Sequence, residues 1–288
     1  MWFWFALLAA ILGGVENYFN KKALHKVRPI LMTWSAFALS LPFVILLTIK
    51  SGLSGFNTLF FVGVVGSSVI YIISKIMKNQ SMKKSDLSKI IPLTSFGTLI
   101  TYIFGLLFLS ESIHILGIVG LLFISLGTYV LNLDKAKEHF FEPIIVLFKD
   151  NSSFVYIIAV AMGSVSSVFD KMGVINTTPY NPALTMLVEN ILMTVILSIL
   201  LLKEKGWQTD LKNNFGVLMT YSAIYTVVSF LLFTSFTDGP VALVSGVKKL
   251  DLVFTLMIGY FFLDDKPLKH AWIATLLMVI GIVMIKAA

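Results

Sequence analysis

Residues 104–111 have the sequence Phe-Gly-Leu-Leu-Phe-Leu-Ser-Glu, and residues 258–265 repeat its pattern as Ile-Gly-Tyr-Phe-Phe-Leu-Asp-Asp. Both stretches end a long apolar segment at acidic residues, and they lie 154 residues apart. The same offset places Gly127 on Gly281. The recurrence indicates two related halves that close in the same way.

The beginnings of the two halves are also related, with an offset of 150 residues. The equivalent pairs are Ala9 with Ala159, Gly13 with Gly163, Phe19 with Phe169 and Lys21 with Lys171. Small residues four apart allow close contact between helices in a membrane. The shared positions favour an internal duplication over chance similarity of two apolar helices.

The composition indicates that the duplicated chain folds in a lipid bilayer and not in water. Of the 288 residues, 57% are hydrophobic and 13% charged, and the mean hydropathy is +0.91. Soluble domains are about 45–50% apolar and about 25% charged. These values exclude a soluble globular enzyme, a disordered chain and a nucleic-acid-binding domain. The formal charge of +7 comes mainly from Lys and Arg between apolar segments, where they meet lipid headgroups.

Hydropathy predicts an all-α integral membrane protein with ten transmembrane helices, since each span needs about 20 residues. The N-terminus has no basic segment before its apolar residues, so it is predicted to be the first span and not a removable signal. The predicted spans are 2–20, 30–49, 59–77, 87–109, 115–133, 154–175, 183–202, 215–236, 241–263 and 271–285.

The organisation follows from the duplication. Residues 1–134 form the first five-helix repeat, 135–153 a polar connector, and 154–288 the second five-helix repeat. Because five is odd, the second copy must cross the membrane in the opposite direction. The prediction is therefore two inverted repeats, an architecture of secondary transporters whose binding site lies near the midplane.

Several short motifs are shared with one known family of membrane transporters. They are 105–111 and its counterpart 259–265, Ser167-Val-Phe-Asp-Lys171 at the end of the sixth span, and Lys248-Lys249-Leu250 inside the ninth. With them, nearly the whole chain resembles the EamA-type ten-helix transporters of the drug/metabolite transporter superfamily. Asp265 departs from the Glu that is usual in that family. The resemblance implies a central cavity surrounded by spans one, three, four, six, eight and nine, and amino acids or related metabolites as substrates.

Ionisable side chains inside spans are functional candidates because each costs at least about 2.5–3.5 kcal/mol at the span centre. Lys248 and Asp251 are three residues apart on one helix face, so they are expected to neutralise each other. Lys249 is then left for a substrate or a gate, with Glu16, Glu189 or a substrate anion as its partner. Asp170 and Lys171 complete the set; for Lys171, contact with headgroups is an equal alternative.

Polar and aromatic residues extend the candidate site. Asn20 lies one turn beyond Glu16 on a polar stripe of the first span, for which an exposed helix end is the structural alternative. The further candidates are Trp34, Tyr71, Thr98, Tyr102 and Tyr225, with core packing as the alternative for Trp34 and Tyr71.

The sequence predicts a secondary transporter of a small polar metabolite, most simply an amino-acid-like zwitterion. The alternatives are a channel or structural membrane protein and, less favoured, an intramembrane enzyme, for which no HExxH or GxSxG motif is present. No cofactor, metal or nucleic-acid partner is expected. Proton coupling through Glu16 or Glu189 stays open beside exchange and uniport, as do monomer and homodimer. The expected location is the inner (cytoplasmic) membrane of a prokaryote.

Lys and Arg are distributed unequally between the two predicted membrane faces. Connectors after the odd-numbered spans and their margins hold 17, whereas the opposite face has Lys50, Lys171 and Lys286. Both termini are predicted on one side. The positive-inside rule places them outside, whereas the family resemblance implies inside, so orientation stays open.

Overall fold

A computed structural model describes residues 1–24, 26–84, 91–132, 145, 151–262 and 269–288. The described part is mostly helical, as the sequence predicts. The predicted connector 135–153 falls mainly outside the described residues, as does Asp265.

The first half of the chain begins with α1 and ends with α7. Its helices are α1 (Trp2–Leu24), α2 (Pro29–Ala38), α3 (Leu41–Ser51), α4 (Thr58–Lys84), the 3-10 helix η1 (Ile91–Ser95), α6 (Phe96–Leu109) and α7 (Ile115–Asn132).

The second half begins with α9 and ends with α14. Its helices are α9 (Asn151–Ile175), α10 (Pro182–Leu201), α11 (Trp207–Ser235), α12 (Val241–Lys248), α13 (Asp251–Phe262) and α14 (Lys269–Ala287).

Two predicted spans are broken helices, which corrects their continuous assignment. The span 30–49 is α2 followed by α3, and the span 241–263 is α12 followed by α13. Pro42 explains the first break, because its ring clashes with the carbonyl four residues earlier, at Ala38, where α2 ends. The second break has no Pro or Gly in it and falls at Lys249 and Leu250.

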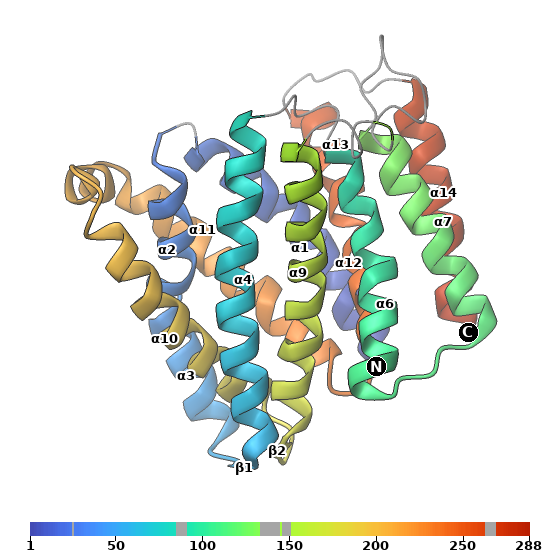
Figure 1. Ribbon diagram of the computed structural model, residues 1–288, viewed down its shortest axis with the longest axis horizontal. Helices are drawn as coiled ribbons and strands as arrows, with labels where there is room; N and C mark the ends of the chain where they lie inside the picture. The colour runs from blue at the N-terminus through green and yellow to red at the C-terminus, as the bar shows by residue number, and fades with distance from the viewer. Residues whose placement is uncertain (25, 85–90, 133–144, 146–150, 263–268) are drawn as a thin grey trace.

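Six segments of the described chain are long and apolar enough to cross a membrane: Trp2–Asn20, Pro29–Ser51, Thr58–Lys78, Asn151–Ile175, Pro182–Leu201 and Trp207–Ser235. The segments Leu93–Leu109, Ile115–Leu131 and Ala271–Ala287 are apolar but shorter. Figure 1 shows both termini in the lower half of the bundle.

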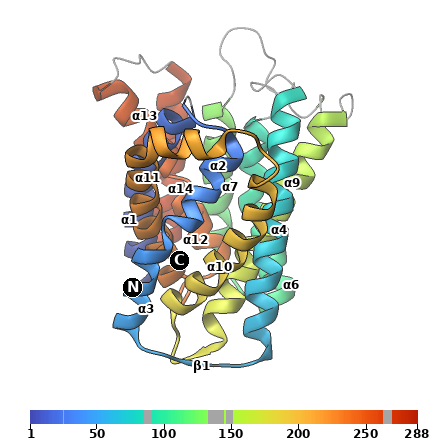
Figure 2. The same ribbon diagram turned by 90° about the vertical axis from the view of Figure 1, so that its left-hand side faces the viewer.

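A short strand pair, which the sequence analysis does not predict, joins the two halves. β1 (Gly55–Phe56) pairs antiparallel with β2 (Thr177–Thr178), and Asn57 Nδ2 donates to Asn176 Oδ1 at 2.8 Å beside it. Figures 1 and 2 both place β1 at the lower end of the bundle. Strands of two residues are too short to give an alternating pattern, so hydropathy cannot reveal them.

Small residues bring two helix pairs into close contact. In the α4–α9 pair, which lies side by side in Figure 1, a side chain at Gly63 would meet the backbone of Gly173. Ser67 Oγ and Ser166 Oγ are 3.1 Å apart across the same seam. Gly120 and Gly281 form an equivalent contact between α7 and α14, which Figure 1 shows together at one edge of the bundle.

The α7–α14 contact leads to a stability prediction. A Cβ atom at Gly281 would lie 2.6 Å from the carbonyl oxygen of Gly120. We expect Gly281→Ala to lower the free energy of unfolding by about 1–3 kcal/mol, because backbone cannot move aside for an added methyl group. The measurement is thermal unfolding in detergent. Gly216→Ala is the control because nothing lies within 4 Å of its added Cβ; an equal loss in both variants would contradict the packing argument.

Candidate functional site

The break between α12 and α13 sets the position of Lys249. α12 ends at Lys248, and the backbone N–H of Lys249 still bonds to the Gly246 carbonyl at 3.1 Å before α13 begins at Asp251. Lys249 has helical backbone angles, and the N–H groups of Leu250 and Leu252 also bond to carbonyls three residues earlier, so the interruption is a 3-10-type turn and not an unwound segment. The chain therefore places a lysine at an interruption in a membrane-embedded helix.

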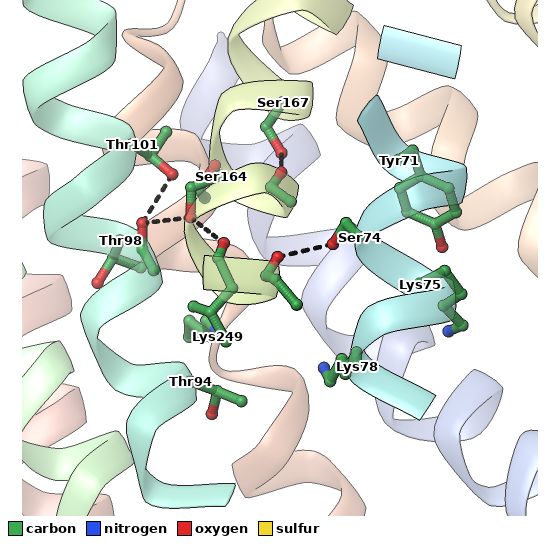
Figure 3. Close-up of a pocket in the computed structure, with 15 residues that line it drawn as sticks. Tyr71, Ser74, Lys75, Lys78, Thr94, Thr98, Thr101, Ser164, Ser167 and Lys249 are labelled. Carbon is green, nitrogen blue, oxygen red and sulfur yellow. Dashed lines mark hydrogen bonds between the residues drawn. The ribbon is translucent and has the colours of Figure 1, made fainter. Parts of the chain in front are cut away.

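A polar cavity of about 240 Å³ lies between α4, η1, α6, α9 and this break. Figure 3 shows Lys75 and Lys78 on one helix and Lys249 across the cavity from them. The remaining lining is rich in hydroxyl groups and small residues: Tyr71, Ser74, Thr94, Gly97, Thr98, Thr101, Ala159, Val160, Gly163, Ser164, Ser167 and Ser245.

Three lysines give the first cavity a positive charge. Lys78 interacts electrostatically with both Lys75 and Lys249, and no carboxylate of the described residues lines this cavity. Among the described residues, the ammonium groups of Lys75 and Lys249 have no hydrogen bond or ion pair, while Lys78 lies 5.8 Å from the ring centroid of Tyr156. Like charges held together in this way favour binding of an anion.

A second cavity of about 460 Å³ adjoins the first and shares Lys78, Ser245 and Lys249 with it. It is also lined by Lys248 and Asp251, whose predicted ion pair is present at 2.8 Å. Glu16 interacts electrostatically with Lys248 and Asp251, and also with Lys75 of the first cavity, so the first helix brings a carboxylate near both cavities. The two cavities together offer a cationic part and a part of mixed charge.

Hydrogen bonds fix the hydroxyl groups of the first cavity. Ser164 Oγ donates to the Gly97 carbonyl at 2.9 Å and thereby ties α9 to α6. Ser74 Oγ donates to the Ala159 carbonyl at 2.7 Å, and Thr98 Oγ1 lies 2.7 Å from Ser125 Oγ. Because these groups already have partners, the cavity wall is preorganised.

Asp170 and Glu189, which the sequence predicts as substrate-binding or gating residues, line neither of these two cavities. Ser67 Oγ donates to Asp170 Oδ1, and the carboxyl groups of Asp170 and Glu189 are in contact. Glu189 is 3% exposed, and no described donor reaches its Oε1 atom. The proposed Lys249–Glu189 pair is therefore absent.

Lys171 also lies outside both cavities, and its side chain does not extend to headgroups. Its ammonium pairs with Glu111 and donates to the Gly239 carbonyl at 2.7 Å. Glu111 in turn accepts the backbone N–H of Val241 at 2.9 Å, so it caps the N-terminus of α12. The network fastens the end of α9 to α6 and α12.

Four other predicted residues lie away from the cavities. Trp34 Nε1 donates to Ser198 Oγ at 2.8 Å, and Tyr225 packs edge-to-face against Phe37. Tyr102 packs against the main hydrophobic core. Asn20 is partly buried near the end of α1 and lines neither cavity. Of the aromatic and polar candidates, Tyr71 and Thr98 line the first cavity.

Lys75 and Lys78 are the cationic residues that the sequence analysis missed. The predicted third span ends at residue 77, which puts both lysines at its margin, but α4 continues to Lys84. Their spacing of three residues on a continued helix would place them on one face. That spacing is the signal that could have found them.

This arrangement can bind an anionic group. Ammonium groups bind carboxylates or phosphates through charge-assisted hydrogen bonds. Among the described residues, no three His, Asp or Glu side chains gather where they could hold a metal ion. The geometry defines a helical protein with apolar, membrane-length helices around a polar cavity that three lysines line.

Comparison with known protein families identifies the family of this chain. The EamA-like transporter family matches residues 1–133 and 152–287, and the chain belongs to this family. The two matched segments cover both halves of the duplicated sequence, consistent with the drug/metabolite transporter superfamily. The protein is accordingly a membrane transporter.

Solved structures support the fold alone. One crystal structure is similar with a TM-score of 0.72 and 14% identity, covering 97% of this chain and 94% of the other. No curated protein matches the sequence.

Proposed function

We propose that this protein is a secondary transporter of small amino-acid-like metabolites, with ten crossings arranged as two inverted five-helix repeats. The observation that carries the substrate class is the cavity lined by Lys75, Lys78 and Lys249, to which the part of the chain that the structure describes adds no lining carboxylate. Asp251 acts on Lys249 and Glu16 on Lys75 only as charge partners, without an ion pair, so a substrate carboxylate bound there would neutralise part of the remaining positive charge.

The adjoining cavity supports a zwitterion. Asp251 lines it, and its carboxylate is a partner for a substrate ammonium group. A molecule with a carboxylate at Lys249 and an ammonium group toward Asp251 would span the two cavities. The excess of lysines favours amino acids with an additional acidic group.

Alternating access would follow from the two halves moving around this site. The location that we expect is the inner membrane of a prokaryote. A channel is the second candidate function, and the transport assay below separates the two.

The first test is thermal stability of the purified protein with a panel of amino acids and of the amines that lack their carboxylates. We expect amino acids, acidic ones most strongly, to raise the melting temperature, because a ligand at 100 times its Kd adds about 2.7 kcal/mol of stability. The amines should have no effect because the lysines repel them. Stabilisation by the amines but not by amino acids would refute the substrate class.

Transport itself is tested with glutamate in proteoliposomes. Unlabelled glutamate trapped inside should drive uptake of labelled glutamate from outside, since a carrier exchanges its substrate across the membrane. A channel gives no such counterflow. Flux without counterflow would therefore favour the channel, and the absence of both, for glutamate and for every stabilising amino acid, would refute transport of this substrate class.

A further inference from the structure

The contact between Asp170 and Glu189 contains two acids and no described cation. Ser67, on α4, donates one hydrogen bond to Asp170. Lys171 is next to Asp170 in the sequence, but its ammonium is engaged by Glu111 and the Gly239 carbonyl. Among the described residues, no Lys or Arg forms an ion pair with either acid.

The described groups on the surrounding helices do not supply a counter-charge. From α11, Tyr225 interacts electrostatically with Glu189, and with Tyr71 of α4 and Glu16 of α1. On the side of the α2–α3 break, Asn190 Nδ2 donates to Ser40 Oγ at 2.9 Å, which is a neutral contact. None of these groups carries a positive charge.

The geometry of the contact requires a donor. Glu189 lies over Gly173 of α9, whose added Cβ atom would be 3.8 Å from Glu189 Oε1, and Gly173 is one turn from Asp170. An ionised carboxylate is only an acceptor of hydrogen bonds, so two of them cannot bond to each other. A proton held by one acid supplies the missing donor and removes one of two adjacent buried charges.

We infer that Asp170 and Glu189 together bind one exchangeable proton, at a site separate from the substrate cavity, and that this proton controls the separation of α9 and α10. The proton comes from water and returns to it, and it belongs to the pair and not to either residue. Its use as a coupling ion rests on the proposed transport function. Glu16 is less suited to this role because Lys248 lies near it.

The site is connected to the substrate cavity through the α4–α9 seam. Ser67, which binds Asp170, and Ser74, which lines the cavity, are seven residues apart and share one face of α4. Loss of the proton leaves two like charges, one on α9 and one on α10, which repel each other. A movement of α9 that results from this repulsion would reach Ser164 and Ser167 in the cavity wall.

Proton occupancy is tested by infrared spectroscopy of the purified protein, with the proton itself as the probe. We expect the native protein to show the C=O stretch of a protonated carboxyl group that disappears in Glu189→Gln and in Asp170→Asn. These variants preserve shape, and gel filtration checks that they are folded. A spectrum that neither substitution changes would overturn the inference.

Helix separation is tested with a single-cysteine reporter, since the chain contains no cysteine. Thr185 is fully buried, one turn from Glu189, and packs against Gly173 of α9. We expect the labelling rate of Thr185→Cys, divided by that of the exposed reference Thr209→Cys, to rise about fivefold or more from acidic to alkaline buffer. The reference removes the ordinary pH dependence of thiol chemistry.

Two substitutions, each added to the Thr185→Cys protein, test whether the acid pair causes the rise in labelling. Glu189→Gln should abolish the rise, because one neutral side chain removes the repulsion, whereas Glu204→Gln, at an exposed ion pair, should leave it intact. An unchanged ratio in the native background, or a rise that persists with Glu189→Gln, would overturn the inference. Neither assay uses a metabolite, so failure of the amino-acid tests leaves these results standing and refutes only the proposed function.

Discussion

We expect Lys249→Ala to weaken binding of glutamate by about 10- to 150-fold, equivalent to the loss of a charged hydrogen bond of about 1.5–3 kcal/mol. Lys249 has no ion pair or hydrogen bond from its ammonium among the described residues, so it is available to a substrate carboxylate. The measurements are a thermal-shift titration and counterflow in proteoliposomes.

The matched control is Lys212→Ala, which removes the same charge from an exposed position near the start of α11. It should leave glutamate affinity within a factor of about two, because screened surface charges contribute little. Equal losses in the two variants, at equal yield of folded protein, would mean that the cavity lysines do not bind the substrate.

The sequence alone is enough to select Lys249 as a candidate site residue. Hydropathy reveals a charge inside an apolar segment directly, and the i to i+3 spacing assigns Asp251 to Lys248, a pair that the structure contains. Lys75 and Lys78 could not be found in the same way. Hydropathy does not distinguish a helix that ends at the membrane surface from one that continues beyond it, as α4 does.

The partners of the other buried charges cannot be derived from hydropathy, since it does not determine how each helix is rotated about its axis. Glu189 is predicted to be buried, but its contact with Asp170 depends on the packing of α9 against α10. The break at Lys249 is equally hidden, because neither Pro nor Gly accompanies it. The sequence shows Glu111 only as the acidic end of the stretch 104–111, whereas in the structure it caps α12.

The second large effect concerns the buried pair between Lys171 and Glu111. Its side chains are 10% and 12% exposed, and the ammonium also satisfies the Gly239 carbonyl at 2.7 Å. We expect Lys171→Ala to lower the free energy of unfolding by about 3–5 kcal/mol, because it leaves a buried carboxylate without its counter-charge. The measurement is unfolding in mixed micelles with increasing denaturing detergent.

The exposed pair between Arg28 and Glu204, with 41% and 46% exposed side chains, is the control. Glu204→Ala should cost less than about 1 kcal/mol, because solvent screens this pair. Adding Glu111→Gln to Lys171→Ala should recover part of the loss, since glutamine can still accept the Val241 N–H but carries no charge. A coupling of about 0.5–3 kcal/mol between the two positions would measure the pair. If Lys171→Ala costs no more than Glu204→Ala, the ends of α6, α9 and α12 are held together by packing, and the ion pair does not fasten this end of the transporter.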